Sequence, residues 1–169
     1  MGKPWLSGSL RSVSGALNPA QLIHTNRART FRAHFARRTK HMLHTRPARR
    51  SHAEISNAIE TTCRRHGYGL LGIHNIGATL RAKGIAYPGE CLVAEICQPN
   101  HAAGLLAADP NLASALPCRI AVQSQHNSCS VSMVSPLALL SALSKQATVH
   151  QLAQQVEEET LAILEELAS

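Results

Sequence analysis

The feature that most constrains the fold is the stretch from Glu95 to Val122, which reads as strand, turn, short helix, turn and strand. Cys97 ends the first of these strands and Cys118 begins the second, and each lies beside a turn that contains proline. Because proline lacks a backbone N–H and fixes φ, it marks where these elements stop and start. Any fold for this chain must therefore hold a short helix between two strands, with a cysteine at the inner end of each.

The strands alternate in polarity, as expected when one face of a sheet is buried. Residues 118–124 and 129–134 each alternate, and the second run places Ser130 and Ser132 on the face opposite Cys129, Val131 and Met133. Two such runs joined by a short polar turn predict a β-hairpin with one wet face, so we expect an antiparallel sheet. In residues 91–97 one face carries Leu92, Ala94 and Ile96, and the other carries Cys91, Val93, Glu95 and Cys97.

Helices are predicted on both sides of these strands. Ser51 and Glu54 form a capping box at the start of a helix with one apolar stripe that includes Cys63, and Gly67 supplies its stop. We expect an edge strand at 40–47, a strand at 68–74 and short helices near 76–84, 100–109 and 136–143. A long C-terminal helix carries an apolar stripe, and we expect its glutamates to form its solvated face: Glu157, Glu158, Glu159, Glu165 and Glu166. The fold class is therefore α+β, an antiparallel sheet packed against helices with a long C-terminal helix.

Charge divides the chain into two parts. Residues 1–50 hold 11 Lys and Arg and no acid, whereas residues 51–169 hold 6 Lys and Arg and 10 acids. We therefore expect a basic extension at 1–39 and one domain at 40–169, and we do not expect the domain to bind nucleic acid. The extension has three interpretations: a disordered tail, an Arg-rich organelle-targeting presequence, or a basic arm that contacts phosphates or anionic lipid.

The cysteines indicate a reducing compartment. There are five, they include no CxxC pair, and no apolar signal-peptide core precedes them. We expect a cytoplasmic location, with organelle targeting by the N-terminus as the alternative. No segment reaches the roughly 20 apolar residues that a transmembrane helix needs.

Residues 91–136 resemble the domain of unknown function 302 family of small, mostly bacterial proteins. The resemblance rests on Cys97-Gln98-Pro99, Asp109-Pro110, Leu116-Pro117-Cys118-Arg119 and Pro136, with Gly67-Tyr68-Gly69 and the Leu80-to-Gly84 turn upstream, and it covers about residues 40–168. It implies a fold similar to the TATA-binding-protein-like arrangement and a homodimer, but no established activity and no DNA binding. The family often has Asn where this chain has Gln98, and both side chains are amides.

The adjoining turns form the candidate site, with six residues: Cys97, Cys118, Glu95, Gln98, Pro99 and His101. Cys97 directly precedes a helix N-terminus, which stabilises thiolates. If the two strands are antiparallel neighbours, which the helix between them permits but does not require, Cys118 lies near Cys97. Cys91 lies about 20 Å from Cys97 along one strand and cannot pair with it. The site suits a soft metal at Cys97 and Cys118, a thiol pair, or simple packing of two small side chains.

These observations lead to one functional hypothesis and one alternative. The chain lacks a Walker loop, GxGxxG, HExxH, GxSxG and paired zinc CxxC motifs, so we expect a binding protein rather than an enzyme, and we predict no cofactor. We expect a dimeric module that binds a small ligand or a protein at the Cys97 and Cys118 turns. The alternative is a thiol-based redox or sulfur-handling protein that uses the same two cysteines.

Overall fold

The computed structural model describes residues 42–126 and 128–169. The predicted basic extension at 1–39 lies outside the described residues, as does the beginning of the predicted edge strand. The elements follow one another in the order β1 (Leu43–Ala48), α2 (His52–Arg65), β2 (Gly69–Asn75), α3 (Ile76–Ala82), β3 (Glu90–Cys97), α4 (Pro99–Ala108), the 3₁₀ helix η2 (Pro110–Ala115), β4 (Cys118–Gln125), β5 (Ser128–Val134), α5 (Pro136–Leu143) and α6 (Ala147–Ala168).

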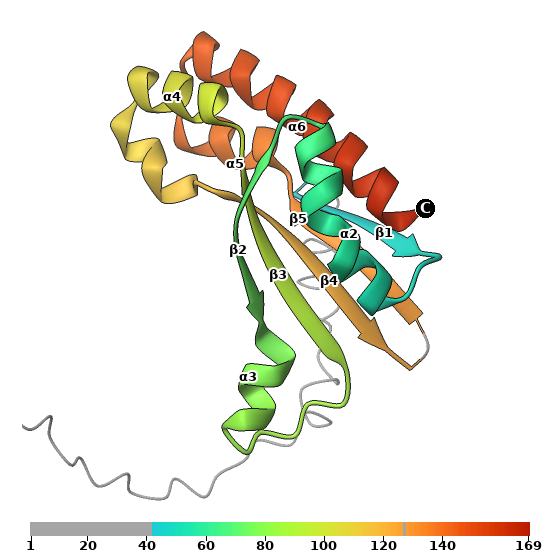
Figure 1. The fold of residues 1–169 in the computed structure, drawn as a ribbon. Helices are drawn as coiled ribbons and strands as arrows, with labels where there is room; N and C mark the ends of the chain where they lie inside the picture. Colours follow the sequence, from blue (N-terminus) through green and yellow to red (C-terminus); the bar gives the residue numbers. More distant parts are fainter. Residues whose placement is uncertain (1–41, 127) are drawn as a thin grey trace, which may run out of the picture. The chain divides into compact units, whose positions relative to one another are not determined.

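The five strands form one sheet in the order β1-β5-β4-β3-β2, and every neighbouring pair is antiparallel. Helices α2 and α6 pack against each other and against the same face of this sheet (Figure 1). The α+β class, the antiparallel sheet and the long C-terminal helix are therefore confirmed. In the part of the chain that the structure describes, no helix is both long and apolar enough to cross a membrane.

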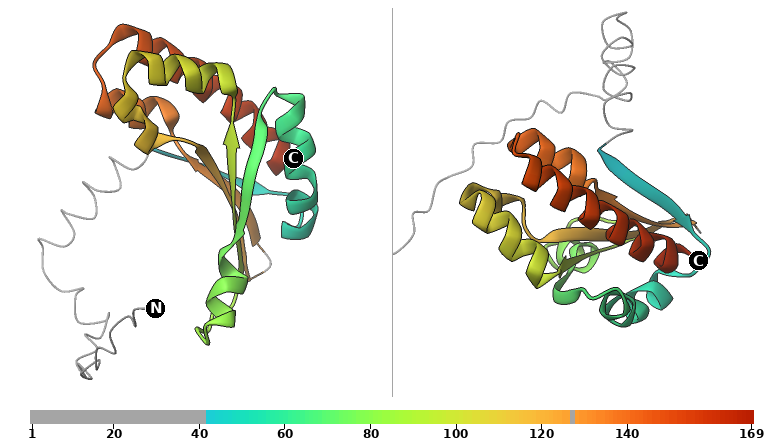
Figure 2. Two further views of the ribbon diagram at one scale, coloured as in Figure 1. Left: turned by 60° about the vertical axis from the view of Figure 1, so that its left-hand side comes forward. Right: turned by 90° about the horizontal axis from the view of Figure 1, so that it is seen from above.

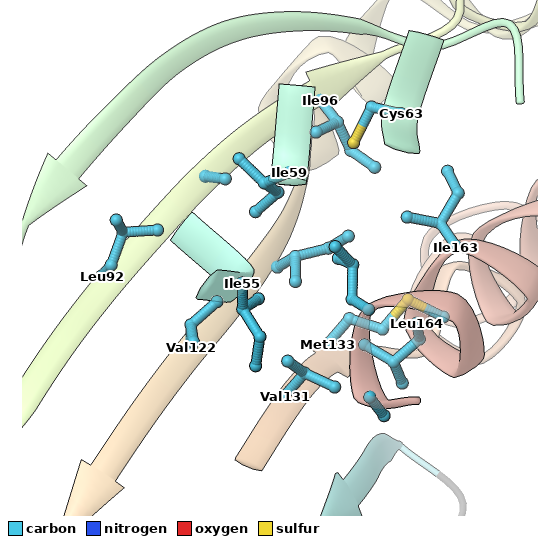
Figure 3. Close-up of a cluster of buried hydrophobic side chains, with 14 of the residues drawn as sticks. Ile55, Ile59, Cys63, Leu92, Ile96, Val122, Val131, Met133, Ile163 and Leu164 are labelled. Carbon is cyan, nitrogen blue, oxygen red and sulfur yellow. The ribbon is translucent and has the colours of Figure 1, made fainter. Parts of the chain in front are cut away.

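The main core fills the space between the sheet and these two helices. Ile55 and Ile59 of α2, Ile163 and Leu164 of α6 and alternate strand residues are all buried together (Figure 3). Cys63 is fully buried among them, as its place on the apolar stripe predicts. The strand residues that face this core are Leu92, Ala94, Ile96, Ile120, Val122, Val131 and Met133.

The ends of α2 follow the predicted local chemistry. Ser51 accepts from the backbone N–H of Glu54, and the Glu54 carboxylate accepts from the backbone N–H of Ser51 at 2.7 Å. Gly67 takes φ +78°, a conformation that most side chains disfavour, and so lets the chain leave the helix. Local sequence therefore determines where this helix begins and ends.

A second group of helices gathers at the end of the sheet where β3 stops and β4 begins. Helices α4 and α5 and the 3₁₀ helix η2 lie there beside the N-terminal half of α6, whereas α3 lies at the opposite end of the sheet (Figures 1 and 2). A smaller core joins them, made of Leu105, Leu112, Leu140, Val149 and Ala153. The 3₁₀ helix was not expected, and it begins after Asp109, whose carboxylate accepts from the backbone N–H of Asn111.

Candidate functional site

A cavity of about 460 Å³ lies at this end of the sheet. Its walls come from the end of β3, the start of β4, β5 and the helices α4 and α5, with Val156 contributed by α6. The wall is mostly apolar, and Leu105, Leu116, Met133 and Leu139 are among its larger side chains. The predicted site residues that line it are Cys97, Gln98, His101 and Cys118.

Strand register explains how both cysteines reach one cavity. Ile96 lies directly opposite Cys118, so the ends of β3 and β4 meet as antiparallel pairing requires. Cys118 lies on the same helix-covered face of the sheet as Ile96. Cys97 is the next residue after Ile96, so it lies on the opposite face. Both thiols are free and both line the cavity, which lies where the sheet ends.

The electrostatics of the two thiols differ from the sequence-based expectation. Burial raises the pKa of Cys97, although a position before a helix N-terminus was expected to favour the thiolate. Burial, followed by the nearby Cys97 and Glu157, raises the pKa of Cys118 to about 11. Both groups are therefore thiols at neutral pH, the form that is a poor nucleophile.

Gln98, not Cys97, caps the N-terminus of α4. The side-chain oxygen of Gln98 accepts from the backbone N–H of His101 at 2.8 Å. Pro99 occupies the first turn of the helix, where its missing backbone N–H costs no hydrogen bond, and it does not line the cavity. The amide of Gln98 thus occupies the position from which an anion would meet the helix N-terminus.

His101 is fixed by a carboxylate on the C-terminal helix. Its Nε2 lies 2.9 Å from Oε2 of Glu159, and the hydroxyl of Tyr68 donates to the same oxygen at 2.9 Å. Tyr68 is buried, and burial together with this hydrogen bond raises its pKa above the ordinary value. The three side chains come from α4, α6 and the residue just before β2, so they join three elements at one edge of the cavity.

A second carboxylate is buried nearby. Glu157 accepts hydrogen bonds from the hydroxyl of Ser135 at 2.8 and 2.9 Å and from the backbone N–H of Leu137 at 3.1 Å. His44 of β1 contacts the same side chain, which is only 12% exposed. Because Glu157 also acts on the pKa of Cys118, this cluster lies close to the cavity.

The prediction that the α6 glutamates form a solvated face is therefore wrong for Glu157, whereas the side chain of Glu159 stays 41% exposed while it contacts Tyr68 and His101. Their neighbours in sequence, Val156 and Thr160, are buried, so both glutamates lie at the border of the apolar stripe. Their position at the border of the apolar stripe was the sequence feature that could have indicated that these glutamates have partners within the fold. Tyr68, His44 and Ser135 were not among the predicted site residues, because their partners lie on elements distant in sequence.

Glu95 is not brought to the cavity. It shares the Cys97 face of β3, but it lies further along the strand, and its carboxylate is 3.5 Å from His74 of β2. Within residues 42–126 and 128–169, no group of three or more His, Cys, Asp or Glu side chains is arranged to hold a metal ion. A metal at Cys97 and Cys118 would therefore need ligands from elsewhere.

Together, these features define a small α+β domain of the antiparallel class, with an apolar cavity at one end of its sheet. The chain belongs to the family described as Domain of unknown function DUF302, whose model matches residues 44–167. The fold is similar to that in the crystal structure of an uncharacterized conserved DUF302 protein from Bacillus stearothermophilus. That match has a TM-score of 0.71 and 20% sequence identity, and it covers 76% of this chain and 98% of the other. No curated protein matches the chain.

Proposed function

We propose that the protein is a binding module that holds a small, largely apolar molecule in the cavity beside Cys97 and Cys118. The observation that carries this proposal is the cavity itself, whose volume of about 460 Å³ lies within the usual range for ligand pockets. Such pockets combine a mostly apolar wall with a few placed polar groups. Here the polar groups include two neutral thiols and the imidazole of His101.

The walls of the cavity are held by contacts that need no ligand. Glu159 ties His101 of α4 to α6, and Glu157 ties the start of α5 to α6 through Ser135 and the backbone of Leu137. These contacts support a cavity that exists before binding, because they fix the helices that form its sides. A preformed cavity reduces the ordering cost that a ligand must overcome.

The alternative, a thiol-based redox or sulfur-handling role, draws support from the two free cysteines in one cavity. The raised pKa of each thiol argues against it, since exchange reactions require a thiolate as the attacking group. We therefore place ligand binding first. The rate at which Cys118 reacts with an alkylating reagent separates the two roles.

Two alanines on α4 provide a matched test of the proposal. Ala102 lines the cavity, whereas Ala107 is exposed on the same helix and does not. We expect the full chain to bind the neutral apolar dye N-phenyl-1-naphthylamine saturably, with an affinity that Ala102→Leu weakens at least severalfold and Ala107→Leu leaves unchanged. Fluorescence titration measures both, and circular dichroism checks that each variant is folded. Equal dye binding by the two variants would reject this cavity as the binding site.

We also propose that the protein forms a homodimer, as its resemblance to the family implies. Strand β2 is an edge of the sheet and exposes Leu71 at 63% and Ile73 at 45%, a combination that favours pairing with a second chain. Analytical ultracentrifugation of the wild type and of Leu71→Lys tests this. We expect a dimer that the lysine weakens, and a monomeric wild type would exclude the assembly.

A further inference from the structure

We infer that the ligand is an amphiphile, with an alkyl chain in the cavity and one negatively charged head group held at its mouth by Arg119. This inference rests on the proposed function, since it names the chemistry of the molecule that the cavity holds. The structure contributes two observations: the position of Arg119, and a mostly apolar cavity wall whose two nearby carboxylates already have partners.

Arg119 is the one arginine among the described residues that lines the cavity. Within residues 42–126 and 128–169, four arginines contact a carboxylate, in the pairs Arg46–Glu165, Arg64–Glu60, Arg65–Glu166 and Arg81–Glu90. Arg119 makes no such contact in the same described ranges. Glu95 lies opposite it in strand register, but the contact of that carboxylate is with His74. The Arg119 guanidinium is therefore available to an anion from outside the chain.

Arg119 is also in the right place to meet a ligand head group. Its side chain lines the cavity and is exposed, on the sheet face opposite Ile96 and Cys118. It is close enough to Cys118 that its positive charge acts to lower the pKa of that thiol, although burial outweighs this effect. A guanidinium at this position presents a planar set of donors that matches a carboxylate.

The interior of the cavity favours an uncharged chain. Leu105, Leu116, Leu139 and Val156 form much of the wall there. The two nearby carboxylates already accept hydrogen bonds, Glu157 from Ser135 and Leu137 and Glu159 from Tyr68 and His101. A charged group placed inside would lose its hydration, and neither carboxylate is free to compensate for that loss. The chain therefore lies inside and the charge remains at Arg119.

Two probes of equal chain length separate the head group from the chain. Octanoate carries a carboxylate at neutral pH and octan-1-ol carries none, so both test the apolar cavity but only octanoate tests Arg119. We expect octanoate to displace N-phenyl-1-naphthylamine from the full chain at pH 7.5 at a concentration at least about threefold lower than octan-1-ol needs, the scale of an exposed charge pair. Raising the ionic strength is expected to reduce this preference and to leave octan-1-ol unaffected.

Variants of Arg119 test whether this residue causes the preference for octanoate over octan-1-ol. Arg119→Gln is expected to abolish the preference for octanoate while leaving octan-1-ol binding unchanged, and Arg119→Lys is expected to keep part of it. Arg49→Gln is the control, because Arg49 is exposed, lies outside this cavity and, within the described residues, contacts no carboxylate. Circular dichroism confirms that each variant is folded.

The possible failures are distinguishable. If the dye and octan-1-ol bind but octanoate shows no preference, the amphiphile inference is overturned and the binding cavity stands. The inference is also overturned if Arg119→Gln weakens both probes equally, since that residue would then act on the cavity shape. If neither the dye nor either probe binds the wild type, the proposed function fails and the inference fails with it.

Discussion

Tyr68 and Glu159 lie 91 residues apart in sequence, and the hydroxyl of the tyrosine donates a hydrogen bond of 2.9 Å to the carboxylate. The same carboxylate oxygen contacts His101. One glutamate of the C-terminal helix thus joins the segment before β2 to the helix that follows β3. This contact fixes one edge of the cavity, and its loss has a measurable cost.

Replacing Tyr68 with phenylalanine keeps the buried ring and removes only the hydroxyl donor. We expect the free energy of unfolding to fall by about 0.5–1.5 kcal/mol, the usual net contribution of one hydrogen bond. Urea denaturation measures the change. Tyr87→Phe is the matched control, because Tyr87 is half-buried and its hydroxyl makes no hydrogen bond within the described residues. An equal loss in both variants would show that the bond to Glu159 does not stabilise the fold.

The carboxylate of Glu157 is expected to contribute more to the free energy of unfolding than that of its exposed neighbour Glu158. Glu157→Gln keeps the side-chain shape but removes the charge that accepts from Ser135 and Leu137, so we expect a loss of about 1–3 kcal/mol in unfolding free energy. Glu158→Gln is the control, since Glu158 is exposed, and its change is expected to stay within about 0.5 kcal/mol. Thermal or urea unfolding of both variants at neutral pH tests this difference.

The Cys118 thiol is expected to react slowly at neutral pH. Its pKa of about 11 leaves far less thiolate at pH 7.5 than a free cysteine has, so alkylation by iodoacetamide should be roughly a hundredfold slower than that of free cysteine. Peptide mass spectrometry after timed alkylation measures the rate at this position. A rate equal to or faster than that of free cysteine would favour the thiol-based function over ligand binding.

The same raised pKa predicts a dependence of stability on pH. The folded state holds the Cys118 proton more tightly than the unfolded state does. The protonated thiol therefore contributes fully to the free energy of unfolding below the ordinary thiol pKa, and this contribution is lost as pH rises from about 9 to 11. Cys63, whose pKa burial also raises to about 11, acts in the same direction. Urea denaturation at pH 8 and pH 10.5 should show a smaller alkaline loss in Cys118→Ala than in the wild type. An identical loss in the two proteins would show that Cys118 does not cause the alkaline decrease in stability.

Gly89 is expected to tolerate no side chain. A Cβ atom at this residue would lie 2.4 Å from the backbone carbonyl oxygen of Ser124, and a backbone atom within the sheet cannot move aside cheaply. Gly89→Ala should therefore lower the free energy of unfolding by about 1–3 kcal/mol. Gly69→Ala is the control, because its Cβ would meet only the Cys97 carbonyl oxygen at 3.7 Å, an ordinary contact. Comparable stability of the two variants would contradict the predicted clash.

Much of the fold could be predicted because local rules decide it. The capping box of Ser51 and Glu54, the left-handed Gly67 and the alternation of 118–124 each act over a few residues, and all three are present in the structure. The sequence also allowed antiparallel pairing of the strands that end at Cys97 and begin at Cys118, and the register of Ile96 with Cys118 shows that they do pair in this way. The 3₁₀ helix after Asp109 was not expected, because such short turns carry little sequence signal.

The sequence by itself therefore determined the α+β class, the strand faces and the helix ends, and it allowed Cys97 and Cys118 to adjoin. Only the tertiary structure decided the chemistry around them. Burial raises the pKa of both thiols. Glu157 accepts from Ser135, and Glu159 accepts from Tyr68 and contacts His101, because those partners are brought in from elements far away in sequence. Burial and long-range hydrogen bonding depend on how helices pack across the end of the sheet. Short-range patterns of residues do not predict that packing.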